Sequence, residues 1–244
     1  MDVVYDWKVL AKDGADGCDD AVAAAPAREG VPFRCAVADG ASESSFSGLW
    51  AELLVRAHAA GCLRARRFRE DLLPLRAEWR RQVSARPLPW YAEAKVAEGA
   101  FAAFVGLAVG VRAARPWWQA TALGDSCLFH VRADRLLCAF PVTTSRAFRR
   151  RPVLLATNPR GHEAGIRRTG GTWEVDDVFL LMTDALAAWF LQAHERGANP
   201  WREVLDLDTR DGPSFREWVA SLRAQRALRN DDVALIRAQV ADGT

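Results

Sequence analysis

Cysteine and histidine are scarce in this chain of 244 residues, and neither type is clustered. The chain has an odd number of cysteines and no Cys-x-x-Cys pair: Cys18, Cys35, Cys62, Cys127 and Cys138. This pattern argues against a disulfide framework and against a zinc site, so we expect buried, reduced thiols. Of the four scattered histidines, His58 and His194 fall in predicted helices, where we do not expect them to be catalytic.

Long apolar runs and an excess of one charge are also missing. No stretch of about 18 uncharged apolar residues is present, which excludes a membrane-spanning helix. The 33 basic and 31 acidic residues leave a formal charge of +2, which argues against a general nucleic-acid or membrane-surface binder. The first residues also lack the basic and then apolar order of a secretion signal. We therefore expect a cytoplasmic protein whose partner is neither nucleic acid nor membrane.

Size and hydrophobic content favour one domain covering residues 1–244. Half of the residues are hydrophobic, and chains usually divide into separate domains only beyond roughly 250–300 residues. Apolar side chains recur at helical spacing over residues 46–57, 68–83, 90–98, 185–195 and 215–222. Strands are predicted over 33–37, 178–182 and 233–240, with a strand meander over 117–138 and a strand or buried helix over 100–109. This alternation in blocks predicts a layered α+β domain.

Residues 141–172 are polar and rich in Arg, Gly and Thr, and they have no sustained hydrophobic period. A loop this long in a compact domain is usually functional, and we interpret it as a flap beside the site. Arg149, Arg150 and Arg151 are candidate substrate contacts, because guanidinium groups pair with phosphate and carboxylate oxygens. A solvated loop face remains the alternative for these arginines.

Aspartate follows or precedes an apolar strand at a turn in five places. These are Asp19-Asp20, Asp39-Gly40, Gly124-Asp125, Thr183-Asp184 and Asp231-Asp232. Each one alone is an ordinary turn residue, helix cap or solvated acid. If the five meet, their carboxylates need a compensating cation, because crowded carboxylates cannot all stay ionised. Without clustered His or Cys, such oxygen donors favour Mg²⁺ or Mn²⁺ over zinc.

The residues around these aspartates, and the order of the motifs along the chain, resemble those of a known family. Val37-Ala38-Asp39-Gly40-Ala41, Ala122-Leu123-Gly124-Asp125-Ser126, Leu181-Met182-Thr183-Asp184-Ala185 and Asn230-Asp231-Asp232-Val233-Ala234 occur in that sequence. Together they resemble the motif series of the metal-dependent type 2C serine/threonine protein phosphatases, in the bacterial single-domain form. The resemblance runs from about residue 8 to residue 238. It implies a four-layer α-β-β-α sandwich, with two packed antiparallel sheets flanked by helices and the metals at one end.

The resemblance also implies which residues hold two Mn²⁺ or Mg²⁺ ions. Asp39 would bridge both ions and, with Asp184, matter most for catalysis. Asp19 and the Gly40 carbonyl would bind one ion with it. Asp184 and Asp231 would hold the other ion.

Further residues follow from the same resemblance. Asp125 and Asp184 would form a weaker third-metal site, and Asp20 and Asp232 would orient the ligands. The family's phosphate-contacting arginine has no clean match, and Lys12 is the nearest cation to that place.

The implied function is a phosphomonoesterase that hydrolyses phosphoserine and phosphothreonine in proteins through a water activated by two metals. Its partners would be a phosphorylated protein substrate and a cognate kinase or its targets. Three departures from the family pattern are Ala185 in place of Gly, Cys127 in place of a basic residue, and Ala-Ser-Glu-Ser-Ser-Phe after Gly40. They leave an alternative open, a pseudophosphatase that acts as a regulatory phosphoprotein-binding module. A nuclease or nucleotide hydrolase is a distant third, because no phosphate-cradling Gly-rich loop with Lys is present.

Overall fold

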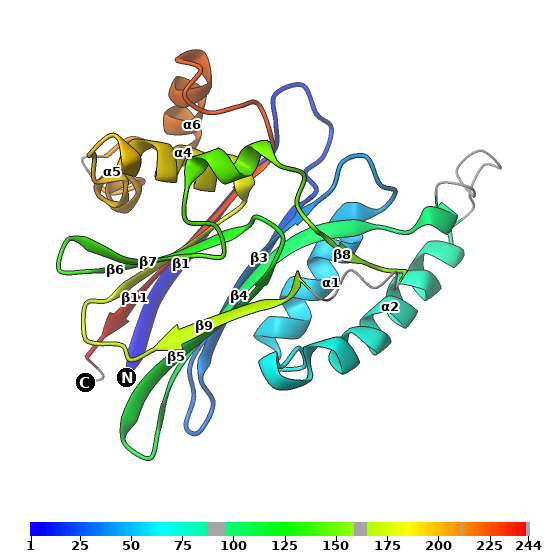
Figure 1. Cartoon of the computed structure of the whole chain (residues 1–244), viewed down its shortest axis with the longest axis horizontal. Coiled ribbons are helices and arrows are strands. Elements are labelled where there is room, and N and C mark those ends of the chain that lie inside the picture. The colour runs from blue at the N-terminus through cyan, green and yellow to red at the C-terminus, as the bar shows by residue number, and fades with distance from the viewer. Residues whose placement is uncertain (87–95, 159–164, 211, 243–244) are drawn as a thin grey trace.

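Two antiparallel sheets packed face to face form the centre of the protein (Figure 1). A computed structural model describes residues 1–86, 96–158, 165–210 and 212–242. The first sheet has the strand order β1 (Asp2–Leu10), β11 (Val233–Ala241), β10 (Val178–Met182), β6 (Cys127–Arg132), β7 (Arg135–Phe140). The second has the order β2 (Asp20–Ala25), β3 (Phe33–Gly40), β4 (Phe101–Arg112), β5 (Arg115–Leu123), β9 (Arg167–Gly171), and β8 (Leu155–Ala156) pairs with β4.

Helices cover the outer face of each sheet. The second sheet is covered by α1 (Ser47–Ala59) and α2 (Phe68–Ser84), with the short η1 (Ala65–Arg67) leading into α2. The first sheet is covered by α4 (Asp184–Glu195), α5 (Pro200–Asp206) and α6 (Phe215–Ala224). The short helix η2 (Ser145–Arg149) lies against α4. These layers confirm the predicted α-β-β-α sandwich.

The alternation of side chains along the strands produces the layers. Val178, Leu180 and Met182 of β10 pack against the helices, whereas Phe179 and Leu181 face the other sheet. Successive side chains of a strand point to opposite faces, so one apolar run supplies two cores. A fully apolar run is therefore what a strand covered on both faces requires.

The predicted meander over residues 117–138 is wrong at its first turn. β5 belongs to the second sheet and β6 to the first, so residues 124–126 carry the chain from one sheet to the other. Gly124 has a φ of +101°, and a Cβ atom there would lie 2.5 Å from the Cβ of Ala103. The crossing thus needs glycine, and it places Asp125 at the end of the sandwich. The second turn, at residues 133–135, joins the hairpin β6–β7 as predicted.

Other expectations have mixed outcomes. The helices predicted over 46–57, 68–83, 185–195 and 215–222 are confirmed, and the ambiguous run 100–109 is a strand. Residues 90–95 of the remaining predicted helix lie outside the described residues, as do 159–164 of the flap; 96–98 are helical. The sequence predicts a loop over residues 141–172, whereas the described part of this segment contains η2, β8 and β9. Within the described residues, no helix combines the length and apolarity needed to cross a bilayer.

Candidate functional site

Three aspartates meet at one end of the sandwich. Asp39 is the last residue but one of β3, Asp125 lies in the crossing between the sheets, and Asp184 begins α4 with one residue between it and the end of β10. One carboxylate oxygen from each of them lies within 4.8 Å of the others. The three come from both sheets, so the pairing of the layers assembles this acidic cluster. Together they could hold a metal ion.

The acidic cluster is short of positive charge. Burial, followed by the carboxylates of Asp184, Asp125 and Asp231, raises the pKa of Asp39 well above its ordinary value. Burial and then the charge of Asp184 raise the pKa of Asp125 to about 7. Burial also raises the pKa of Asp184, although Arg229 opposes this. Hard oxygen donors with uncompensated charge suit Mg²⁺ or Mn²⁺, so the residues present fit a divalent cation.

A buried hydrogen-bond network supports the acidic cluster. Asp20 lies opposite Asp39 in the β2–β3 pairing, and the Thr183 hydroxyl donates to the Asp20 carboxylate over 2.8 Å. The same hydroxyl accepts from the backbone N–H of Ala234 at 2.8 Å. Burial and then the charge of Asp39 raise the pKa of Asp20. Sequence reasoning missed Thr183, although its place directly before Asp184 was a usable signal.

Asp232 holds the segment that carries Asp19. Its carboxylate accepts from the backbone N–H groups of Lys12 and Asp19, each at 2.8 Å. The Asp19 carboxylate in turn accepts from the N–H of Gly48 at 3.1 Å, in the first turn of α1. A carboxylate there is stabilised by the free N–H groups of the helix start. Asp232 therefore fixes the position of Asp19, whose predicted role as a metal ligand stays a prediction.

Gly40 lets three segments approach closely. A Cβ atom on Gly40 would lie 2.8 Å from both the Asp19 carbonyl oxygen and the Ser47 carbonyl carbon. Its N–H donates to the same Asp19 oxygen at 3.2 Å. Backbone atoms cannot yield as a flexible side chain can, so a larger residue would push the Asp19 segment away. The predicted role of the Gly40 carbonyl as a ligand stays a prediction.

Arg229 is the cation of the acidic cluster, and sequence reasoning missed it. Its guanidinium forms an ion pair with Asp184, and its Nε lies 3.2 Å from the Asp231 carboxylate. Arg229 is therefore paired with two aspartates, Asp184 and Asp231, that are predicted to bind the same metal ion. Asp231 lies outside the group of three within the described residues, but its charge raises the pKa of Asp39. A signal was available, since Arg229 stands two residues before Asp231.

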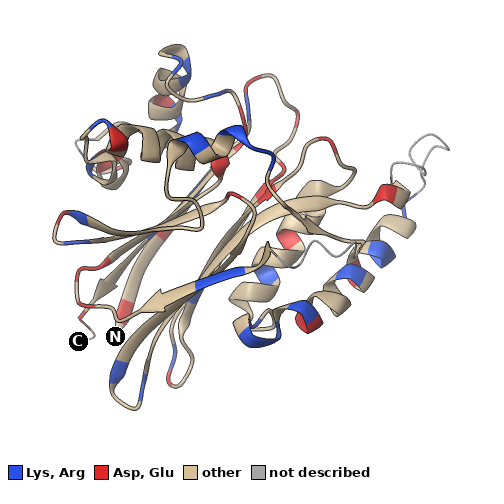
Figure 2. Cartoon of the chain, viewed as in Figure 1, with Lys and Arg blue, Asp and Glu red and all other residues tan. Residues whose placement is uncertain are grey.

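The cations proposed for substrate binding lie in different places. Lys12 donates from its Nζ to the Ser42 hydroxyl at 3.0 Å, in the turn after Gly40. Arg151 pairs with Glu43 at 3.1 Å, with both side chains 88% exposed. Arg150 is exposed, and Arg149 lines a cavity beside α4. Figure 2 shows basic residues along the η2 segment, which crosses α4. Arg149 and Arg151 thus border different cavities, and the predicted role of the three arginines as substrate contacts stays a prediction.

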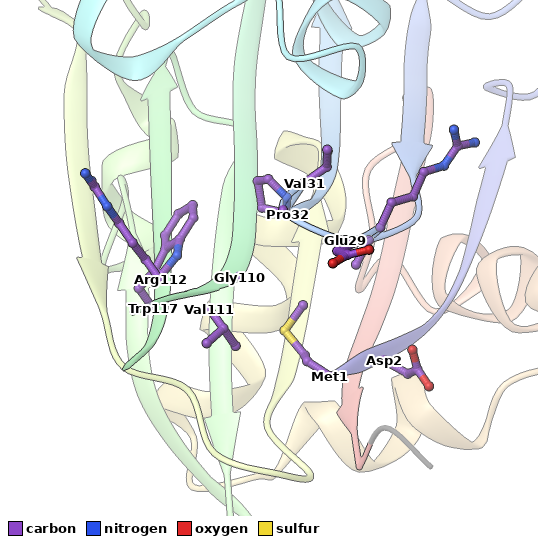
Figure 3. A pocket seen from close by; sticks show the side chains of 12 residues that line it. Met1, Asp2, Glu29, Val31, Pro32, Gly110, Val111, Arg112 and Trp117 are labelled. Atoms are coloured by element: carbon purple, nitrogen blue, oxygen red, sulfur yellow. The ribbon is translucent and has the colours of Figure 1, made fainter. Parts of the chain in front are cut away.

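A second cavity lies at the opposite end of the sandwich. It measures about 590 Å³ and is bordered by Met1, the turn before β3 and the end of β4 (Figure 3). Among its lining residues are Glu29, Arg112 and Trp117. It shares no residue with the acidic cluster, so the chemistry of the aspartates belongs to the other end.

Solved structures with this fold cover nearly the whole chain. The serine/threonine phosphatase PstP/Ppp of Mycobacterium tuberculosis matches with a TM-score of 0.66 and 14% identity, covering 99% of this chain and 100% of that one. The catalytic domain of PstP in complex with two manganese ions matches with a TM-score of 0.62 and 18% identity, over 99% of each chain. Stp1 of Staphylococcus aureus matches with a TM-score of 0.64 and 14% identity, over 98% of this chain and 95% of that one.

At these identities the structural likeness shows the fold alone. Among curated proteins, none matches the chain at a significant level. A family model described as protein phosphatase 2C, however, matches residues 12–243. That match contains every aspartate of the acidic cluster and spans almost the entire sequence, and it shows that the chain belongs to the protein phosphatase 2C family.

Proposed function

We propose that this protein hydrolyses phosphoserine and phosphothreonine in proteins, using two Mn²⁺ or Mg²⁺ ions. The observation that carries the proposal is the convergence of Asp39, Asp125 and Asp184 with too little positive charge around them. When bound, a pair of such ions lowers the pKa of the attacking water and offsets the charge of the phosphate oxygens. The structure of PstP with two manganese ions, which has the same fold, supports this choice of metals.

The chain's own residues have separate tasks in this proposal. Asp39, Asp184 and Asp231 would hold the ions, with Asp19 and the Gly40 carbonyl on the side of α1. Asp125 and Asp184 would form the weaker third site. These assignments rest on the motif resemblance, supported for Asp39, Asp125 and Asp184 by their short mutual distances.

Neighbouring groups keep the acids in place. Thr183 holds Asp20 beside Asp39, and Asp232 holds the backbone of Asp19. Partners of this kind orient ligands, and their removal from a metal site typically lowers affinity or activity about 10–100-fold. The substrate partners would be phosphorylated proteins, with a cognate kinase among the proteins that act on the same targets.

One observation favours the second candidate, a pseudophosphatase that binds phosphoproteins without turnover. Arg229 already pairs with two of the acids assigned to one ion, so a metal must displace it. A binding module would leave this ion pair intact. Metal-dependent turnover separates the two candidates directly.

The decisive measurement is phosphate release from a phosphoserine peptide with Mn²⁺, with Mg²⁺ and with a chelator. We expect release with either ion and none with the chelator. Asp39→Asn should lower kcat/KM at least about 100-fold, because it removes a ligand rather than a residue that supports one. Asp2→Asn, an exposed acid of β1 at the opposite end, is the matched control and should keep the wild-type rate.

Two results would contradict the proposal. Release that persists in the chelator would rule out a metal-dependent reaction. Peptide binding without release under any metal condition would favour the binding module instead.

A further inference from the structure

A cavity of about 460 Å³ lies between η2 and α4, next to the acidic cluster. Ala185, directly after Asp184, lines it, and so does Arg229, which pairs with Asp184. Ala188, Trp189 and Gln192, further along α4, also line it. A group bound in this cavity would therefore sit beside the aspartates, not at a remote surface.

Three arginines border this cavity, and no acidic residue does among the residues that the structure describes. Arg146 and Arg149 come from η2, and Arg229 comes from the segment before β11. In the described part of the chain, Arg146 and Arg149 have no acidic partner. Guanidinium groups without an acidic partner, such as those of Arg146 and Arg149, are suited to an anion, since their planar N–H donors match carboxylate and phosphate oxygens.

The start of η2, the short helix that carries Arg146 and Arg149, is fastened to α4. The backbone N–H and the hydroxyl of Ser145 donate to the two carboxylate oxygens of Glu195, at 2.7 and 2.5 Å. Glu195 is the last residue of α4, so these bonds fasten the start of η2 to the end of that helix. Anchored donors lose less freedom when an anion binds, which favours binding.

We propose that this cavity binds an acidic side chain of the substrate, close in sequence to the phosphorylated residue. The inference rests on the proposed function and deepens it, because it assigns acidic phosphopeptides as the preferred substrate class. An extended peptide advances about 3.3–3.6 Å per residue, so an acid one to three positions from the phosphoserine can reach the cavity. Arg146 and Arg149 determine this specificity, and Arg229 borders both the cavity and the acidic cluster.

Two labelled phosphoserine peptides test the proposal, one with Glu at the three positions on each side and one with Gln there. Their binding is measured by fluorescence anisotropy in a chelator, where no turnover occurs, and their kcat/KM is measured with Mn²⁺. The wild-type protein should favour the Glu peptide about tenfold, as expected for charge-assisted bonds that remain partly exposed.

The variant Arg146→Ala/Arg149→Ala should bring the ratio between the two peptides close to one. Both side chains are exposed on η2, so their truncation spares the core. The control Arg196→Ala/Arg216→Ala removes the same charge from exposed arginines that do not line this cavity, and it should keep the wild-type ratio.

Equal binding of the two peptides by the wild-type protein would overturn the proposal. A ratio that survives in the Arg146→Ala/Arg149→Ala variant would overturn it as well. Failure of the proposed function has a different signature, which is absence of phosphate release from either peptide. If the Glu peptide still binds more tightly through Arg146 and Arg149 in that case, the cavity is an acidic-peptide site of a binding module.

Discussion

The two ends of β10 carry aspartates in opposite electrostatic situations. Asp177 directly precedes the strand, and Asp184 follows it after Thr183, about 20 Å away at the rise of an extended chain. Asp177 is fully buried and accepts two hydrogen bonds from Arg132, at 2.6 and 2.7 Å, and one from the N–H of Glu174, at 2.9 Å. Although burial raises its pKa, these bonds together hold that pKa below the ordinary value.

Asp184 also forms an ion pair with one arginine, Arg229, but several other carboxylates lie near the same arginine. Arg229 also pairs with Asp231, while Asp39 and Asp125 lie within reach of the same charge. The pKa values of Asp39, Asp125 and Asp184 are raised as a result of burial and mutual repulsion. The ratio of cations to carboxylates thus distinguishes the end where the acid is paired with an arginine from the end where the acids could hold a cation.

The sharpest test of this contrast is Asp177→Asn. Removing the charge of the fully buried Asp177 leaves the partly buried Arg132 without its main partner, and we expect a loss of about 2–4 kcal/mol in the free energy of unfolding. Urea unfolding in a chelator measures it. Asp125→Asn is the matched variant at the other end, and it should leave the stability of the metal-free protein unchanged or raise it, because it relieves repulsion. Equal losses in both variants would contradict the contrast.

Metal binding should stabilise the folded protein through the acidic cluster and not through Asp177. A ligand that binds the folded state alone adds about 2.7 kcal/mol at 100 times its dissociation constant. The melting temperature should therefore rise with Mn²⁺ in both the wild-type protein and the Asp177→Asn variant. The variant should have the lower melting temperature before Mn²⁺ is added. Asp39→Asn should lose most of the rise. A melting temperature that is insensitive to Mn²⁺ throughout the millimolar range would count against the metal site.

The pH dependence of stability should also differ between the ends. The pKa of Asp125 is about 7 in the folded protein against 3.8 ordinarily, so the folded state keeps a proton that the unfolded chain has released. Stability of the metal-free protein should therefore fall as pH rises from about 4 to about 7. Asp177, with a lowered pKa, acts in the opposite sense and loses its contribution as pH falls below about 4.

Unfolding by urea in a chelator at several pH values measures this slope. Asp125→Asn should flatten it, and saturating Mn²⁺ should do the same by taking the place of the proton. Stability that rises with pH over the same range in the metal-free protein would show that the acids are already compensated.

The smallest effect is expected for Arg229→Ala. Because Arg229 competes with a metal for Asp184 and Asp231, its removal should tighten Mn²⁺ binding about two- to fivefold, the range expected for a half-exposed ion pair. Arg229→Lys keeps the charge and should stay near the wild-type affinity. Isothermal titration with Mn²⁺ measures both variants. Weaker binding in Arg229→Ala would mean that the arginine supports the site rather than competing for it.

The sequence predicted the acidic cluster because its signals are local. Asp39, Asp125 and Asp184 each stand at a turn beside an apolar strand, and strand ends of a sandwich meet at its rim. Asp177 also stands at a turn beside an apolar strand, so this local signal does not separate it from the acidic cluster. Its partner Arg132 is 45 residues away, and only the pairing of β6 with β10 brings the two together.

The hydrophobic pattern of the sequence also does not predict the edge strand β9 or the direction of the Arg229 side chain. The strand β9 has the sequence Arg-Arg-Thr-Gly-Gly, whose side chains are largely exposed and show no apolar alternation. It is a strand because its backbone pairs with β5. Arg229 was visible beside Asp231, but its contact with Asp184 depends on how the segment before β11 turns.

The position of Arg229 would couple the two proposed ligands, the divalent cation and the acidic peptide. It borders the arginine-lined cavity and pairs with Asp184, so a divalent cation that takes the aspartate releases a guanidinium toward an anion. If both ligands bind as proposed, releasing Arg229 from its two acids would serve both binding events and make them cooperative. Thermodynamic linkage requires the effect to be reciprocal: an acidic peptide should tighten Mn²⁺ binding by the same factor by which Mn²⁺ tightens peptide binding.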